Sequence, residues 1–114
     1  MDIQQLFSID GKTALVTGGS RGIGEMIAAG FLANGVKVYI SSRKADACEA
    51  TAARLTERFG GECIPLPGDA STLAGVDALV AELSSRASQL DILVMNAGVS
   101  WGAPLEVCPE IGWV

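Results

Sequence analysis

The sequence has no histidine and only three cysteines, which are Cys48, Cys63 and Cys108. The cysteines are far apart and none lies in a C-x-x-C pair, so both the residue types and the spacing of a zinc site are missing. We therefore expect no metal site. We also expect three reduced thiols, mostly buried as small apolar side chains.

Long apolar runs and positive charge are also scarce. Although 49% of the residues are apolar, no stretch approaches the ~18 uninterrupted apolar residues of a membrane-spanning helix. The first five residues lack the basic start and apolar core of a secretory signal. Eight basic residues against thirteen acidic ones give a net charge of −5, which argues against nucleic acid or an anionic membrane as the main partner. We expect a cytoplasmic protein, in which a small anionic ligand is possible only where positive charge is concentrated locally.

The chain instead shows a regular alternation of short β-branched runs with longer stretches of helical period. Its 114 residues suit one domain and are too few for two. The predicted strands are residues 12–17, 36–40, 62–66 and 91–95. The predicted helices are residues 22–34, 48–59 and 73–83. Strands that alternate with helices in this way indicate βαβ units around a parallel sheet.

Each predicted helix has an apolar stripe that we expect to face the sheet. The three stripes are Ile23, Ile27 and Phe31 with Met26 and Leu32; Cys48, Ala52, Leu55 and Phe59; and Leu73, Val76, Leu79, Val80 and Leu83. The second helix also carries a charged face, which we expect to be solvated. Ser71 is the predicted N-cap of the third helix.

The strongest local signal is the run Thr17-Gly18-Gly19-Ser20-Arg21-Gly22-Ile23-Gly24, where a buried strand turns into a helix. The free N–H groups and positive dipole end of a helix N-terminus suit a dinucleotide pyrophosphate, provided that the main chain can come close. Gly18 then makes the tight turn, Gly22 admits the phosphates, and Gly24 lets the helix pack closely on the sheet. The spacing is G-x-x-x-G-x-G and not G-x-G-x-x-G. A glycine loop without a ligand is the alternative.

The end of the second strand indicates which dinucleotide is bound. Proteins that prefer NAD place an acidic residue here, on the ribose 2′-hydroxyl, but this chain has Ser42 and Arg43. Arg43 offers a planar fork for a 2′-phosphate, Ser42 can donate a hydrogen bond, and Arg21 can close on the same phosphate. We therefore expect NADP (NADPH) as the cofactor, with NAD less favoured. The alternative for Arg43 is an exposed loop cation.

Asp69 follows the third strand, where an exposed carboxylate can accept a hydrogen bond from the adenine amino group. It can instead cap the turn into the next helix.

The glycine run on the first strand, Asp69 after the third and Asn96-Ala97-Gly98 after the fourth resemble the short-chain dehydrogenase/reductase family. The resemblance implies a Rossmann-type doubly wound parallel sheet, here partial, with four strands in the order 3-2-1-4. It implies hydride transfer between NAD(P) and a carbonyl or alcohol carbon. It also implies three groups of cofactor contacts: Gly18, Ser20, Arg21, Gly22, Ile23 and Gly24 for the pyrophosphate and adjacent ribose; Asp69 and Ala70 for the adenine; and Asn96, Ala97 and Gly98 for the central strand and ribose region.

Within the family, residues 100–106 and 109–113 look like the NADPH-dependent β-ketoacyl reductase and gluconate 5-dehydrogenase-like branches, which implies a 3-oxoacyl or sugar-acid-like substrate. Two departures stand out. Met95 occupies the place of a usual asparagine, which we expect to cost local order more than cofactor affinity. The family's catalytic Tyr-x-x-x-Lys, serine and helix asparagine cannot be assigned, because the only tyrosine, Tyr39, lies in a strand and is followed four residues later by Arg43.

The family pattern puts these catalytic groups after Val114. We therefore expect residues 1–114 to be a single NAD(P)-binding domain truncated before the catalytic half, inactive alone and homo-oligomeric when full length. The fourth strand should be left with an open apolar edge. Two alternatives remain, namely a dinucleotide-binding or regulatory module without catalysis and a flavodoxin-like domain, which the glycine motif disfavours.

Overall fold

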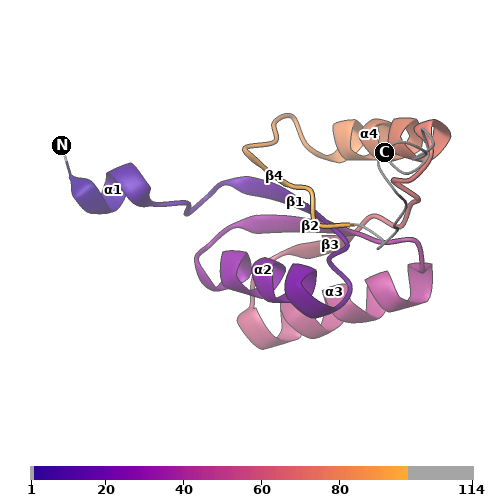
Figure 1. Cartoon of the computed structure of the whole chain (residues 1–114). Coiled ribbons are helices and arrows are strands. Elements are labelled where there is room, and N and C mark those ends of the chain that lie inside the picture. Colours follow the sequence, from indigo (N-terminus) through magenta and orange to yellow (C-terminus); the bar gives the residue numbers. More distant parts are fainter. Residues whose placement is uncertain (1, 98–114) are drawn as a thin grey trace, which may run out of the picture.

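Four apolar and β-branched segments pair side by side in one parallel sheet, with helices on both faces (Figure 1). The computed structural model describes residues 2–97. The strands are β1 (Thr13–Thr17), β2 (Lys37–Ser41), β3 (Cys63–Pro65) and β4 (Ile92–Val94). The helices are α1 (Ile3–Phe7), α2 (Gly22–Ala33), α3 (Ala45–Phe59) and α4 (Leu73–Arg86). The strand order β3-β2-β1-β4 confirms the predicted doubly wound arrangement.

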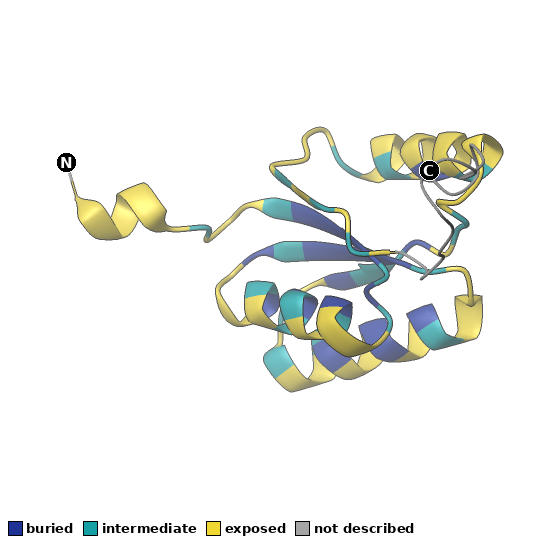
Figure 2. Cartoon of the chain, viewed as in Figure 1, coloured by how far each residue is buried: buried dark blue, intermediate teal, exposed yellow. Residues whose placement is uncertain are grey.

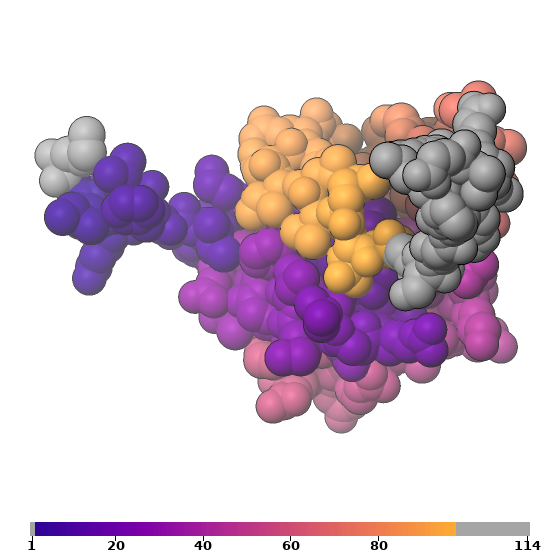
Figure 3. Space-filling view, viewed as in Figure 1, coloured from indigo at the N-terminus to yellow at the C-terminus, as the bar shows by residue number. Residues whose placement is uncertain are grey.

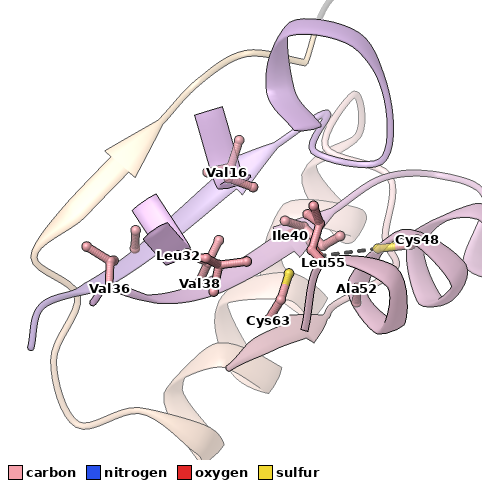
Figure 4. Packing of buried hydrophobic residues seen from close by; sticks show 11 residues of the cluster. Val16, Leu32, Val36, Val38, Ile40, Cys48, Ala52, Leu55 and Cys63 are labelled. Carbon is pink, nitrogen blue, oxygen red and sulfur yellow. Dashed lines mark hydrogen bonds between the residues drawn. The ribbon is translucent and has the colours of Figure 1, made fainter. Parts of the chain in front are cut away.

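Helices α2 and α3 cover one face of the sheet and enclose its larger core (Figure 4). Alternate residues of each strand point to this face, as Val16, Val38 and Ile40 do. Against them α3 packs the predicted stripe that begins at Cys48 and continues through Ala52 and Leu55, which confirms that stripe. This face is therefore buried over β1, β2 and the start of β3, while Ile92 and Val94 of β4 are partly buried at its edge.

Two of the three thiols belong to this core. Cys48 and Cys63 are free and buried, as predicted, whereas Cys108 lies outside the described residues. The Cys48 thiol donates to the Ile40 carbonyl oxygen at 3.3 Å. Burial raises the pKa of Cys48, and burial raises the pKa of Cys63 to about 12. Both groups are thiols at neutral pH and behave as small apolar side chains.

Among residues 2–97, α4 is the one helix on the opposite face, and the core there is smaller. Leu15, Tyr39 and Leu66 pack there against Leu79. The rest of the predicted α4 stripe is largely exposed, and Leu73 has 78% of its surface accessible. The helix prediction is confirmed, but the burial of its whole stripe is wrong, because within residues 2–97 no second helix lies beside α4 on this face (Figure 2).

Strand β4 pairs only with β1 among the described residues. Leu93 stands opposite Leu15 in the register, on the α4 face, and is 55% exposed. The predicted open apolar edge is thus present in this part of the chain.

Two local predictions need correction, and one helix was not predicted. In α2 the predicted stripe packs on the core through Leu32, which is buried, and through Ile27 and Phe31, which are partly buried against it. The part of the stripe that is wrong is Ile23 and Met26, which are 69% and 72% exposed, because the small residues Gly24 and Ala28 take the buried positions at this end of the helix.

The N-cap of α4 is Thr72, not Ser71. The Thr72 hydroxyl accepts from the Gly75 N–H at 3.0 Å, whereas Ser71 is held by Asp69. Helix α1 was not predicted from the sequence. It buries no residue, is capped by Asp2 and projects away from the sheet (Figure 3).

Candidate functional site

All four strands run parallel, so the connections that follow them gather at the carboxyl edge of the sheet. The connection between β1 and α2 lies at the centre of this edge. The N–H groups of Gly18 and Gly19 both donate to the Ser41 carbonyl, at 2.7 and 3.3 Å. Gly18 has a φ of +68°, which bears out its predicted role in a tight turn. The glycine turn is thus anchored on the end of β2.

In the described part of the chain, the main-chain donors at the start of α2 are unused. The first N–H of this helix to find a backbone acceptor is that of Glu25, which donates to the Arg21 carbonyl at 3.3 Å. The N–H groups of residues 20–24 have no hydrogen-bond partner within residues 2–97. Gly22 has a φ of +59°, and a β-carbon added there would meet no described atom within 4 Å. Free N–H groups, the helix dipole and open space together suit an anion.

Gly24 allows α2 to seat against the turn. A β-carbon at this position would lie 2.7 Å from the Asn96 amide nitrogen and closer still to the Gly18 carbonyl oxygen. Neither contact is tolerable, so the predicted close packing through Gly24 is confirmed.

The end of β4 is tied to the same turn through Thr17, which is 3% exposed. Its hydroxyl accepts from the N–H groups of Asn96 and Ala97, at 3.0 and 3.1 Å, and donates to the Val94 carbonyl at 3.3 Å. The Asn96 side-chain amide donates to the Gly18 carbonyl at 3.3 Å. Asn96 and Ala97 thus lie beside the glycine turn, while Gly98 lies outside the described residues.

No role was predicted for Thr17 from the sequence. The feature that could have indicated one is a hydroxyl residue at the end of an otherwise apolar strand, directly before the first glycine.

Ser42 and Arg43 leave the carboxyl end of β2, next to the strand that carries the glycine turn. The Ser42 carbonyl accepts from the Gly68 N–H at 2.9 Å, which ties this loop to the connection after β3. Arg43 is exposed and makes no ion pair with the described residues. Within residues 2–97 the Arg43 guanidinium therefore has no partner.

Asp69 follows β3 and sits in a local turn. One oxygen of its carboxylate accepts from the N–H of Ser71 at 2.9 Å and from its hydroxyl at 2.5 Å. These hydrogen bonds, and to a lesser extent the charge of Arg43, lower the pKa of Asp69. The turn-capping alternative is therefore observed. The second carboxylate oxygen has no partner within residues 2–97, and the exposed Ala70 is adjacent. An adenine contact at Asp69 and Ala70 stays a prediction.

Among the described residues, few side chains could transfer a proton to a substrate or bind a metal ion. Tyr39 is fully buried under α4 and cannot meet a substrate. Among the described residues no group of histidine, cysteine or acidic side chains is arranged to hold a metal ion. In the same range no helix has the length and apolar character to cross a membrane.

Comparison with known proteins gives consistent results. Residues 12–113 match the sequence profile of the short chain dehydrogenase family. Over 107 residues the chain is 52% identical to the rhamnolipids biosynthesis 3-oxoacyl-[acyl-carrier-protein] reductase of Pseudomonas aeruginosa, covering 94% of this chain and 41% of that protein.

Two solved structures illustrate the likeness in three dimensions. The Pseudomonas aeruginosa RhlG/NADP active-site complex has a TM-score of 0.78 at 51% identity, over 82% of this chain and 37% of that one. L-Sorbose reductase from Gluconobacter frateurii, complexed with NADPH and L-sorbose, has a TM-score of 0.82 at 36% identity, and the match covers 93% of this chain and 40% of that one. The chain thus spans less than half the length of these relatives.

Proposed function

The chain belongs to the short-chain dehydrogenase family, and from this premise we propose that it provides the NADP(H)-binding part of an oxidoreductase. The reaction is hydride transfer between the nicotinamide and a carbonyl or alcohol carbon of a small substrate. One observation carries the proposal: within residues 2–97 the N–H groups at the start of α2 have no hydrogen-bond partner, and they lie at the sheet edge where the Arg43 side chain is exposed. The NADP and NADPH complexes of RhlG and L-sorbose reductase support it.

The pyrophosphate and its neighbouring ribose would be held by the turn that contains Gly18, Ser20, Arg21, Gly22, Ile23 and Gly24. Ile23 is mostly exposed at the first turn of α2 and so is available for such a contact. Asp69 and Ala70 would contact the adenine, and Asn96, Ala97 and Gly98 would line the ribose region. The bound nucleotide would donate the hydride as NADPH or accept it as NADP⁺, while these residues bind and orient it.

NADP is favoured over NAD by the charge at the end of β2. A carboxylate at this place would accept from a ribose 2′-hydroxyl and repel a 2′-phosphate, whereas Arg43 attracts the phosphate. Arg21 is exposed in the glycine turn and Ser42 adjoins Arg43. The three side chains would together enclose the extra phosphate.

The substrate class follows from the relatives. We propose a 3-oxoacyl or sugar-like carbonyl compound, because one relative is a 3-oxoacyl-[acyl-carrier-protein] reductase and another binds L-sorbose. The family's Tyr-x-x-x-Lys does not occur in the sequence. We therefore propose that residues 1–114 alone reduce no ketone. We also propose that the whole protein is a cytoplasmic homo-oligomer.

Calorimetric titration with NADP and NAD tests the proposal. We expect NADP to bind more tightly. Arg43→Asp should weaken NADP roughly 10- to 100-fold, the worth of a charge-assisted contact, and improve NAD.

Arg58→Asp is the matched control. It makes the same charge change at the other end of α3, roughly 20 Å away by helical rise, and should leave both affinities unchanged. A folded protein that binds neither nucleotide would refute the proposed function. An unchanged preference in Arg43→Asp would refute the assigned 2′-phosphate contact.

A further inference from the structure

Helix α3 contacts the glycine turn through one buried hydroxyl. The Thr51 hydroxyl donates to the Ser20 carbonyl at 2.7 Å, between residues 31 apart in the sequence. Thr51 is 3% exposed. Its buried neighbours on α3, Cys48 and Ala52, belong to the apolar core on the sheet. The Thr51 hydroxyl is thus a buried polar group that is satisfied by the main chain of the glycine turn.

A second contact orients this hydroxyl. Arg54, one turn further along α3, donates to the Thr51 oxygen at 3.4 Å and forms an ion pair with Glu25 in the first turn of α2. Thr51 therefore accepts from Arg54 while it donates to Ser20. Helix α3 thus contacts the turn at two places that flank the free N–H groups of residues 21–24. The first is the Ser20 carbonyl, and the second is the Glu25 side chain.

The direction of one main-chain donor follows from this arrangement. In a trans peptide unit the C=O and the N–H point to opposite sides. Because the Ser20 carbonyl is held toward α3, the N–H of Arg21 is directed away from α3. Arg21 is exposed, and Gly22 beside it faces open space. The Thr51 hydrogen bond therefore fixes the peptide that presents a donor to the phosphates.

We infer that Thr51 is a positioning residue for the phosphate-binding turn, acting through the Ser20–Arg21 peptide without touching the cofactor. This inference rests on the proposed function. Without the hydroxyl, the Ser20 carbonyl is left unpaired and the peptide can rotate, so the turn must be reordered when the pyrophosphate binds.

The test compares Thr51→Val with Thr51→Ser, using two ligands. NADP engages the main-chain donors of the glycine turn through its pyrophosphate. Adenosine 2′-monophosphate lacks the pyrophosphate and engages side chains only, those of Arg21, Ser42 and Arg43 at the 2′-phosphate and that of Asp69 at the adenine. Thr51→Val should weaken NADP binding roughly fivefold, the worth of one net hydrogen bond, and leave the monophosphate affinity unchanged. Thr51→Ser should restore NADP binding.

Thr56→Val is the matched control. The Thr56 hydroxyl also lies on α3 but bonds to the main chain of Cys63 in β3, at 3.2 and 3.3 Å, so this variant should bind NADP like the wild type. If Thr51→Val does not fold, Thr51→Ala removes the same hydroxyl without an apolar branch.

An unchanged NADP affinity in Thr51→Val would overturn the inference. So would an equal loss for both ligands, or a serine variant that fails to restore binding, because these results indicate a structural role only. A wild-type protein that binds neither ligand would overturn the proposed function as well, and the two failures are thereby distinguished.

Discussion

Replacing Gly24 by alanine tests how closely α2 must approach the glycine turn. The added methyl group would lie 2.7 Å from the Asn96 amide nitrogen and nearer still to the Gly18 carbonyl oxygen. Carbon in ordinary contact needs about 3.5 Å, so the helix has to withdraw by roughly 1 Å. Overpacking of this kind costs ~1–3 kcal/mol. The higher helix propensity of alanine offsets about 1 kcal/mol of that cost.

Gly30→Ala is the matched control, because it makes the same change in the same helix. A β-carbon at Gly30 meets no atom within 4 Å, and the residue is exposed. We expect this variant to gain about 0.5–1 kcal/mol. Helix propensity cancels between the two variants, so their difference of about 1–3 kcal/mol measures the packing contact alone.

Urea denaturation followed by circular dichroism gives this difference. With a slope of about 1–3 kcal/mol per molar urea, the midpoint for Gly24→Ala should fall roughly 1 M below that for Gly30→Ala. NADP binding should weaken in Gly24→Ala only, because the displaced helix start moves the donor groups. Equal midpoints for the two variants would show that α2 does not touch the turn as the structure has it.

Three further outcomes are expected. Thr17→Val leaves the N–H groups of Asn96 and Ala97 without their acceptor and should lower the free energy of unfolding by about 1–3 kcal/mol; a Thr17→Ser variant should recover most of this, and an equally stable valine variant would speak against the contact. The pKa of Asp91 is lowered chiefly by the hydrogen bond from the Thr13 N–H, so its stabilisation is complete above the unfolded pKa of ~3.9 and is lost as the pH falls through the lower, folded value. The stability gap between wild type and Asp91→Asn should therefore shrink from about pH 6 to below about pH 4, and a gap independent of pH would contradict the assignment. In a Cys108→Ser background, Ellman's reagent should label the two remaining thiols only on unfolding, since a pKa of about 12 at Cys63 leaves roughly one thiolate in ten thousand at pH 8; rapid labelling of the folded protein would disprove their burial.

Local patterns predicted the elements of this fold well. The runs around Val16, Val38 and Ile64 are strands, and the glycine run lies between a strand and a helix, as predicted. The exposure of Ile23 and Met26 at the start of α2 was not predictable, because helical period shows that an apolar stripe exists but not which of its residues the sheet covers. Helix α1 was missed because its five residues bury nothing and leave no stripe.

The contacts that shape the candidate site were mostly hidden from sequence analysis. Gly18, Gly22 and Gly24 were found through their spacing, because the geometry of a tight strand-to-helix turn requires residues without a side chain at such positions. Thr17 and Thr51 were not, because their partners lie 77–80 and 31 residues away in the sequence. A hydroxyl residue in a strand or helix carries no local mark of such a partner.

The elements, the parallel sheet and the glycine turn can be predicted from the amino-acid order, because hydrophobic period and main-chain conformation act over a few neighbouring residues. Folding is needed to show that α2 buries Ala28 while it exposes Ile23 and Met26, and that α4 keeps much of its apolar stripe exposed. It also decided that hydroxyls from β1 and α3 fasten the turn. Such features depend on close contact between distant segments, which exists only once the chain has folded.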